Sequence, residues 1–119
     1  MHKMVENIIP ILSCSDFDSS LEYYQNALGF RVDWTHDGSF ASVSRDDWTI
    51  YLSANPVGEA HGTVWIGVED IEGLYHELTS SGAHIRGELI DNPWACELHV
   101  VDLDGNLLRF GGEPRTGKG

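Results

Sequence analysis

The sequence is poor in positive charge. Seven lysines and arginines stand against nineteen aspartates and glutamates, so the formal net charge is −12 over 119 residues. Binding to nucleic acid or to an anionic membrane requires basic side chains, and we expect neither as a partner. A negative field favours cationic or neutral ligands, although the same acidity also serves solubility alone.

Cysteine and long apolar runs are also scarce. Two cysteines are too few for a disulfide scaffold, and neither belongs to a zinc-binding pattern. No stretch approaches the ~18 apolar residues of a membrane span, and the first residues lack the apolar segment of a signal peptide. We therefore expect a cytoplasmic protein. A hydrophobic share of 41% is enough for a single domain with one core.

One pattern occurs in both halves of the chain. Asp16 and Asp70 each open an amphipathic stretch with helical spacing, and Gly29 and Gly82 close these stretches. Aspartate caps the free N–H groups at the start of a helix, and glycine adopts the left-handed turn at its end. The two stretches therefore predict two helices.

Strand patterns surround each predicted helix, one before it and three after it. The expected strands are 7–13, 30–36, 40–45 and 48–53 in the first half, and 63–68, 85–90, 96–101 and 107–110 in the second.

These elements predict an α+β fold of two βαβββ modules, about 7–54 and 63–110, within one domain. Residues 55–62 are the expected linker, and 113–119 are predicted to be a mobile tail. The modules would form a curved mixed sheet with helices outside and a concave cleft inside, which suits a small ligand.

Alternation along the strands predicts which residues face this cleft. In the strand 63–68, Val64, Ile66 and Val68 are expected under a helix, and Thr63, Trp65 and Gly67 in the cleft. In the strand 48–53, Trp48, Ile50 and Leu52 are expected in the core, and Thr49, Tyr51 and Ser53 in the cleft.

Several motifs carry a resemblance to a known family. Ile9-Pro10-Ile11-Leu12 leads into Asp16, Leu28-Gly29-Phe30 follows, and a turn runs from Asp102 to Leu108. Together they resemble the glyoxalase/bleomycin-resistance/dioxygenase superfamily, also called vicinal oxygen chelate, although Leu103 replaces the usual proline of that turn. Within it, the segment 40–47, Trp65 and Asn92-Pro93-Trp94 are similar to the bleomycin-resistance (antibiotic-binding) proteins.

The resemblance also locates a metal site in the enzymes of the superfamily, on the first, fourth, fifth and eighth strands. The corresponding residues here are Ile11, Tyr51, Thr63 and Arg109. None supplies a histidine or carboxylate donor, and arginine would repel a cation. The six histidines are scattered, and no nucleophile elbow or phosphate loop is present. We therefore expect no metal, no cofactor and no catalytic residue.

By the same resemblance, the rings of Phe40 and Trp94 would sandwich a planar heteroaromatic group, and acidic residues would accept a cationic tail. The predicted ligand-binding residues are Asp33, Trp34, Phe40, Ser53, Glu59, Thr63, Trp65, Trp94 and Arg109.

The preferred hypothesis is a binding protein that sequesters bleomycin-type glycopeptide antibiotics without modifying them. The resemblance further implies a homodimer with clefts between subunits and an exchanged N-terminal strand. One alternative is a metal-dependent glyoxalase- or dioxygenase-type enzyme whose site the sequence does not reveal. Another is a binder of a different planar small molecule that shares only the scaffold.

Overall fold

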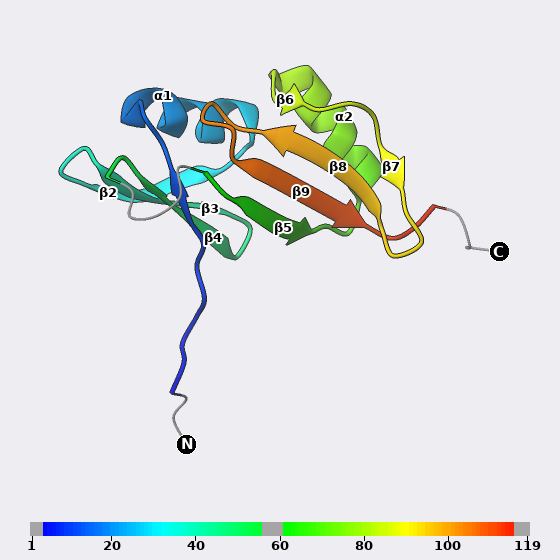
Figure 1. The fold of residues 1–119 in the computed structure, drawn as a ribbon, viewed down its shortest axis with the longest axis horizontal. Coiled ribbons are helices and arrows are strands. Elements are labelled where there is room, and N and C mark those ends of the chain that lie inside the picture. Colours follow the sequence, from blue (N-terminus) through cyan, green and yellow to red (C-terminus); the bar gives the residue numbers. More distant parts are fainter. Residues whose placement is uncertain (1–3, 56–60, 116–119) are drawn as a thin grey trace.

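The structure is a computed structural model, and it describes residues 4–55 and 61–115. Within these residues the elements follow each other along the chain as Figure 1 shows. Their bounds are β1 (Ile11–Ser13), α1 (Phe17–Glu22), η1 (Tyr23–Ala27), β2 (Arg31–His36), β3 (Phe40–Arg45), β4 (Trp48–Ser53), β5 (Thr63–Gly67), α2 (Ile71–Ser81), β6 (His84–Ile85), β7 (Ile90–Asp91), β8 (Cys96–Val101) and β9 (Leu107–Gly112).

The strands form two sheets, one from each half of the chain. Sheet A has the order β1-β4-β3-β2, and sheet B has the order β5-β9-β8-β6 with β7 also paired to β8. The first and last strands of each module are parallel neighbours, and the other pairs are antiparallel. The predicted α+β fold of two βαβββ modules is confirmed, with two mixed sheets in place of one continuous sheet. The helices lie on the same side of both sheets (Figure 1).

Both predicted helix starts are confirmed by capping contacts. The carboxylate of Asp16 accepts a hydrogen bond from the N–H of Ser19 at 3.1 Å, and that of Asp70 accepts one from the N–H of Gly73 at 2.9 Å. At the end of α2, Gly82 adopts the left-handed conformation with φ 89°. The side-chain and backbone requirements at these ends therefore match the residue types.

The first helix differs from the uniform helix that the periodicity predicts. After α1 the chain continues as the π-helix η1, in which the N–H of Leu28 donates to the carbonyl of Tyr23 at 3.1 Å. The wider winding places two consecutive residues, Tyr23 and Tyr24, in the interior. A 3.6-residue period cannot distinguish such a local change of winding.

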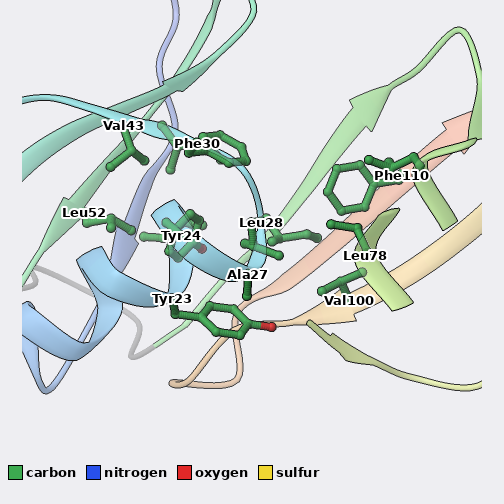
Figure 2. Packing of buried hydrophobic residues seen from close by; sticks show 14 of the residues in the cluster. Tyr23, Tyr24, Ala27, Leu28, Phe30, Val43, Leu52, Leu78, Val100 and Phe110 are labelled. Atoms are coloured by element: carbon green, nitrogen blue, oxygen red, sulfur yellow. The ribbon is translucent and has the colours of Figure 1, made fainter. Parts of the chain in front are cut away.

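One hydrophobic core joins the two modules. Figure 2 shows Leu28 between Val43 and Leu52 of sheet A on one side and Leu78 and Phe110 of the second module on the other. All five belong to the same cluster of buried residues. The core therefore extends through both modules and holds them together.

The first and sixth expected strands are shorter than predicted. β1 begins only at Ile11, and the residues before it run away from the body of the molecule (Figure 1). The expected strand 85–90 is two short strands, β6 and β7, because Gly87 between them has φ 79°, outside the β region.

Trp48 contradicts the expectation that it belongs to the core. Its side chain is 79% exposed, whereas Ile50 and Leu52 of the same strand are buried as predicted. Trp48 pairs with Arg45 at the end of the β3–β4 hairpin. Alternation predicts the face on which a side chain lies, but it does not predict how far the helices cover that face.

A buried polar cluster at the β8–β9 turn holds the modules together. Asn106 is fully buried; its Oδ1 accepts from the N–H of Gly62, and its Nδ2 donates to the carbonyl of Ser13, each at 2.8 Å. Asp102 accepts from the Tyr24 hydroxyl and from Asn106 Nδ2, also at 2.8 Å. Two side chains of the second module thus bind backbone and side-chain groups of the first.

No helix in the part of the chain that the structure describes is long and apolar enough to cross a membrane. The predicted linker and tail fall partly on residues 56–60 and 116–119, which lie outside the described residues.

We predict that Asn106→Ala lowers the free energy of unfolding by about 3 kcal/mol, because it leaves buried donors and acceptors unpaired. Urea unfolding measured by far-UV circular dichroism checks this. Asn26→Ala, the same change at an exposed helical position, should stay within about 0.5 kcal/mol of the wild type. Equal losses in the two variants would contradict the role given to Asn106.

Candidate ligand-binding site

Each sheet has one face that no helix covers, and we call these the open faces of sheets A and B. The strand registers assign their residues. In sheet A, Ile11, Tyr51, Ser42 and Trp34 lie in one row across the four strands. In sheet B, Trp65, Arg109 and His99 lie in one row across β5, β9 and β8.

Three aromatic rings gather on the open face of sheet A. The ring centroids of Trp34 and Phe40 are 5.9 Å apart, with the planes inclined by 27°, and Tyr51 lies 5.5 Å from Trp34 and 5.2 Å from Phe40. Trp34 remains 44% exposed. Such a cluster offers both ring faces and ring edges to a flat or cationic ligand.

An irregularity in β2 places a carboxylate beside these rings. The register between β2 and β3 shifts between Val32 and Trp34, so Asp33 is an extra residue on its strand. Its Oδ2 accepts from the hydroxyls of Ser42 at 2.9 Å and Ser44 at 2.5 Å, on the open face. In a regular strand, Asp33 and Trp34 would point to opposite faces; the bulge brings both to one.

The surroundings of Asp33 favour its ionised form. The hydrogen bond from Ser44, followed by those from Ser42 and the contact with Arg31, lowers the pKa of this carboxyl. Arg31 Nε lies 3.3 Å from Asp33 Oδ1, but its side chain is largely exposed. Sheet A therefore presents rings together with an ionised carboxylate, whose cationic partner Arg31 lies largely in solvent.

The open face of sheet B is organised around one carboxylate. Glu97 is fully buried, and its ionised carboxylate accepts hydrogen bonds from four side chains. They are Arg109 (Nε at 2.9 Å and Nη2 at 3.0 Å), His99 (Nε2 at 2.9 Å), Trp94 (Nε1 at 2.8 Å) and Asn92 (Nδ2 at 3.1 Å). The bidentate contact with Arg109 is the largest cause that lowers the pKa of Glu97 to about 2.

Trp65 lies against a strand that has no side chain at the point of contact. A Cβ on Gly111 would collide with the Trp65 ring, so the glycine is what allows the indole to lie flat. The Cζ atom of Arg109 is 5.6 Å from the centroid of this ring. Trp65 is 48% exposed and forms, with Arg109, a flat and partly accessible surface.

The structure thus distributes the predicted site residues over two faces. Asp33, Trp34 and Phe40 come together on sheet A, and Trp65, Trp94 and Arg109 on sheet B. Ser53 is buried beside Phe40 in the register. Thr63 pairs with Leu107 at the start of β5, away from the row that contains Arg109. Glu59 lies outside the described residues.

Phe40 and Trp94 do not form a sandwich within one chain. Phe40 contacts rings of sheet A only, and Trp94, 65% exposed on the loop before β8, makes no ring contact with any described residue. A ligand held between these two rings requires the faces to be brought together.

The residues at the superfamily's metal positions do not fit a metal ion. Ile11 pairs with Tyr51, Arg109 pairs with Trp65, and Thr63 pairs with Leu107. Isoleucine and arginine offer no ligand atom to a cation, and threonine offers only a neutral hydroxyl. Over residues 4–55 and 61–115, no group of three or more His, Cys, Asp or Glu side chains is arranged to hold one.

Sequence reasoning missed the residues that hold the site in place, above all Glu97, His99, Ser42 and Ser44. A signal for Glu97 was present: a charged residue in the middle of the apolar strand 96–101 requires a buried partner, and Arg109 lies on the adjacent strand. The hydroxyls had no comparable signal, because their role depends on the bulge.

Comparisons with known proteins agree with this architecture. Residues 8–110 match the model of the Glyoxalase/Bleomycin resistance protein/Dioxygenase superfamily. No curated protein sequence matches the chain.

Solved structures show the same fold at low identity. The bleomycin-binding protein from bleomycin-producing Streptomyces verticillus, complexed with copper(II)-bleomycin, is 23% identical with a TM-score of 0.77, covering 94% of this chain and 98% of that one. A bleomycin resistance determinant encoded on the transposon Tn5 is 22% identical with a TM-score of 0.78, covering 92% and 98%. Lactoylglutathione lyase from Agrobacterium tumefaciens is 15% identical with a TM-score of 0.72, covering 97% and 99%. The fold therefore occurs in binders and in enzymes.

We predict a pH dependence that belongs to Glu97. A carboxyl whose pKa is lower in the folded state contributes stability above its unfolded pKa, and this contribution disappears as the pH falls through the folded value. Glu97→Gln should therefore be about 2 kcal/mol less stable than the wild type at pH 7. The difference should shrink as the pH falls from 4.5 toward about 2.

Chemical unfolding at a series of pH values measures this difference. Glu88→Gln makes the same change on an exposed side chain and should show almost no difference at any pH. A gap between Glu97→Gln and the wild type that does not change with pH would contradict the assignment.

Proposed function

The chain belongs to the glyoxalase/bleomycin resistance protein/dioxygenase superfamily, and from this premise we propose that it binds and sequesters bleomycin-type glycopeptide antibiotics without modifying them. The observation that carries the proposal is the pairing of Asp33 with the cluster of Trp34, Phe40 and Tyr51 on one open face. Rings and a carboxylate together suit a ligand that has a planar part and a cationic part.

Charge supports the same class of ligand. The chain has a net charge of −12, and Asp33 is held in its ionised form beside the rings. A cationic ligand is attracted at long range by the whole chain and at short range by this carboxylate.

Sequestration requires only affinity. A protein that covers the ligand lowers its free concentration, and the binding free energy comes from buried apolar area and complementary charge. The side chains that the resemblance assigns to the superfamily's metal positions, Ile11, Tyr51, Thr63 and Arg109, favour this reading over a metal-dependent enzyme, because none of them is a histidine or a carboxylate.

We also propose that the protein acts as a homodimer in which sheet A of one subunit faces sheet B of its partner. Phe40 and Trp94 lie on different faces of one chain, so a sandwich between them needs a second subunit. Met4 and Ile8 are exposed to 92% and 91% on the segment before β1, which runs away from the body (Figure 1). An apolar segment in this position suits exchange between subunits.

The dimer predicts a mass in sedimentation equilibrium of twice the 13.2 kDa of one chain. Ile8→Asp should shift the equilibrium toward the monomer, because it places a charge in the proposed contact. This variant keeps Met4 and Val5, so it changes a single exposed apolar side chain of the segment. A wild-type protein that sediments as a monomer at ~100 μM would contradict the dimer, since stable dimers of ordinary interface area are fully formed at that concentration.

The ring of Trp94 provides the direct test of binding. Titration of the chelator-treated protein with metal-free bleomycin, followed by isothermal calorimetry, should give saturable binding near one ligand per chain. Trp94→Ala should weaken this binding by about 2 kcal/mol, as is typical of an aromatic anchor. Trp48→Ala is the matched control, because Trp48 is exposed at the far end of a hairpin; it should leave the affinity unchanged. Equal affinities of wild type and Trp94→Ala would contradict the sandwich.

The salt dependence of the affinity measures the contribution of charge separately from that of the rings. The affinity for the cationic ligand should fall as the NaCl concentration is raised from 0.05 to 0.5 M. Salt screens charges over a Debye length of ~10 Å at 0.1 M, and over a shorter distance at higher concentrations. Asp33→Asn should bind about fivefold more weakly and show a smaller salt dependence. Asp18→Asn removes the same charge from the helical side and should resemble the wild type. A flat salt dependence would assign the acidity to solubility alone.

A further inference from the structure

The pairing of Arg109 with Glu97 uses only part of the guanidinium. Nε and Nη2 donate to the two carboxylate oxygens at 2.9 and 3.0 Å, which occupies one edge of the planar group. No described residue accepts a hydrogen bond from Nη1. The side chain is 38% exposed, while Glu97 beneath it is completely covered. One edge of the guanidinium is therefore held rigidly and the other is accessible.

The guanidinium of Arg109 lies over a flat ring. Trp65 is the register partner of Arg109 on the neighbouring strand, and its indole lies against Gly111. The guanidinium is 5.6 Å from the ring centroid. A planar ligand that stacks on the exposed part of Trp65 would thus have its edge near the guanidinium of Arg109.

The charge at this place selects a neutral ligand group. Glu97 compensates the charge of Arg109 through the bidentate contact. The net charge of −12 disfavours free anions at long range. The accessible edge of Arg109 is therefore a strong hydrogen-bond donor that needs an oxygen acceptor but no ionic partner.

We propose that Trp65 and Arg109 form a second subsite, which takes a neutral aromatic carboxamide with its ring on the indole and its carbonyl oxygen on Nη1 of Arg109. The proposal deepens the proposed function and rests on it for the identity of the whole ligand: one face would bind the cationic part and the other a carboxamide-bearing ring. Glu97 acts here as a positioning residue, because it holds both Arg109 and the indole N–H of Trp94.

Benzamide and benzylamine test the subsite with one ring and two different groups. The readout is two-dimensional ¹H–¹⁵N NMR of the indole N–H of Trp65 and the Nε–H of Arg109 in the full chain. Benzamide at millimolar concentration should shift both signals along a saturable curve, and benzylamine should shift neither. Shifts by benzylamine as large as those by benzamide would overturn the selection for a neutral acceptor.

Arg109→Lys keeps the charge and removes the second N–H edge, so it should weaken benzamide binding at Trp65 at least fivefold. Arg86→Lys makes the same change at another exposed arginine and should bind as the wild type does. Gly111→Ala leaves the polar contacts of Glu97 in place and displaces the Trp65 ring; it should also weaken binding at least fivefold, and it replaces Arg109→Lys if that variant does not fold. Unchanged benzamide affinity in the folded variants would overturn the proposal.

Parallel titrations with metal-free bleomycin distinguish the two proposals. Benzamide binding that depends on Arg109, in a protein that does not bind bleomycin, supports the subsite and contradicts the proposed antibiotic. Bleomycin binding without any benzamide shift at Trp65 contradicts the subsite and leaves the proposed function in place.

Discussion

The contact of Asp102 and Asn106 with the first module is the constraint on which the arrangement of the sheets depends. These two side chains are buried at a turn of the second module, and they bind Tyr24, the carbonyl of Ser13 and the N–H of Gly62. The hydrophobic core supplies most of the driving force, but apolar packing is not directional. The polar cluster has one geometry in which every partner is satisfied, so it fixes the orientation of one module against the other.

The two open faces are chemically different although the modules share a topology. Each has a carboxylate at its centre, but Asp33 is surrounded by hydroxyls and remains partly accessible, whereas Glu97 is buried under a cation and an indole. Asp33 is paired with Arg31, whose side chain lies largely in solvent, whereas Glu97 is paired with the more covered Arg109. A ligand that contacts both faces therefore meets two different demands, and this asymmetry contains more information about the ligand than the fold does.

Much of the fold could be predicted because it depends on local rules. The caps at Asp16 and Asp70 and the alternation in β3 and β4 follow from single-residue preferences and strand geometry. The candidate site was harder to predict, because its key features depend on contacts between residues far apart in the sequence. The bulge at Asp33 is visible only in the register between two strands, and the exposure of Trp48 depends on the reach of the helices. That Trp65 lies next to Arg109 likewise depends on the pairing of β5 with β9.

The bulge in β2 also makes the open face of sheet A easy to alter during evolution. The alternation of side chains before Asp33 is offset by one residue from the alternation after it. Loss of a single codon at this place would therefore restore a regular strand. The carboxylate would then leave the face that carries Trp34, while the hairpin and the core beneath could stay as they are. A single insertion or deletion at this position would therefore change which polar groups accompany the aromatic cluster and leave the scaffold unchanged.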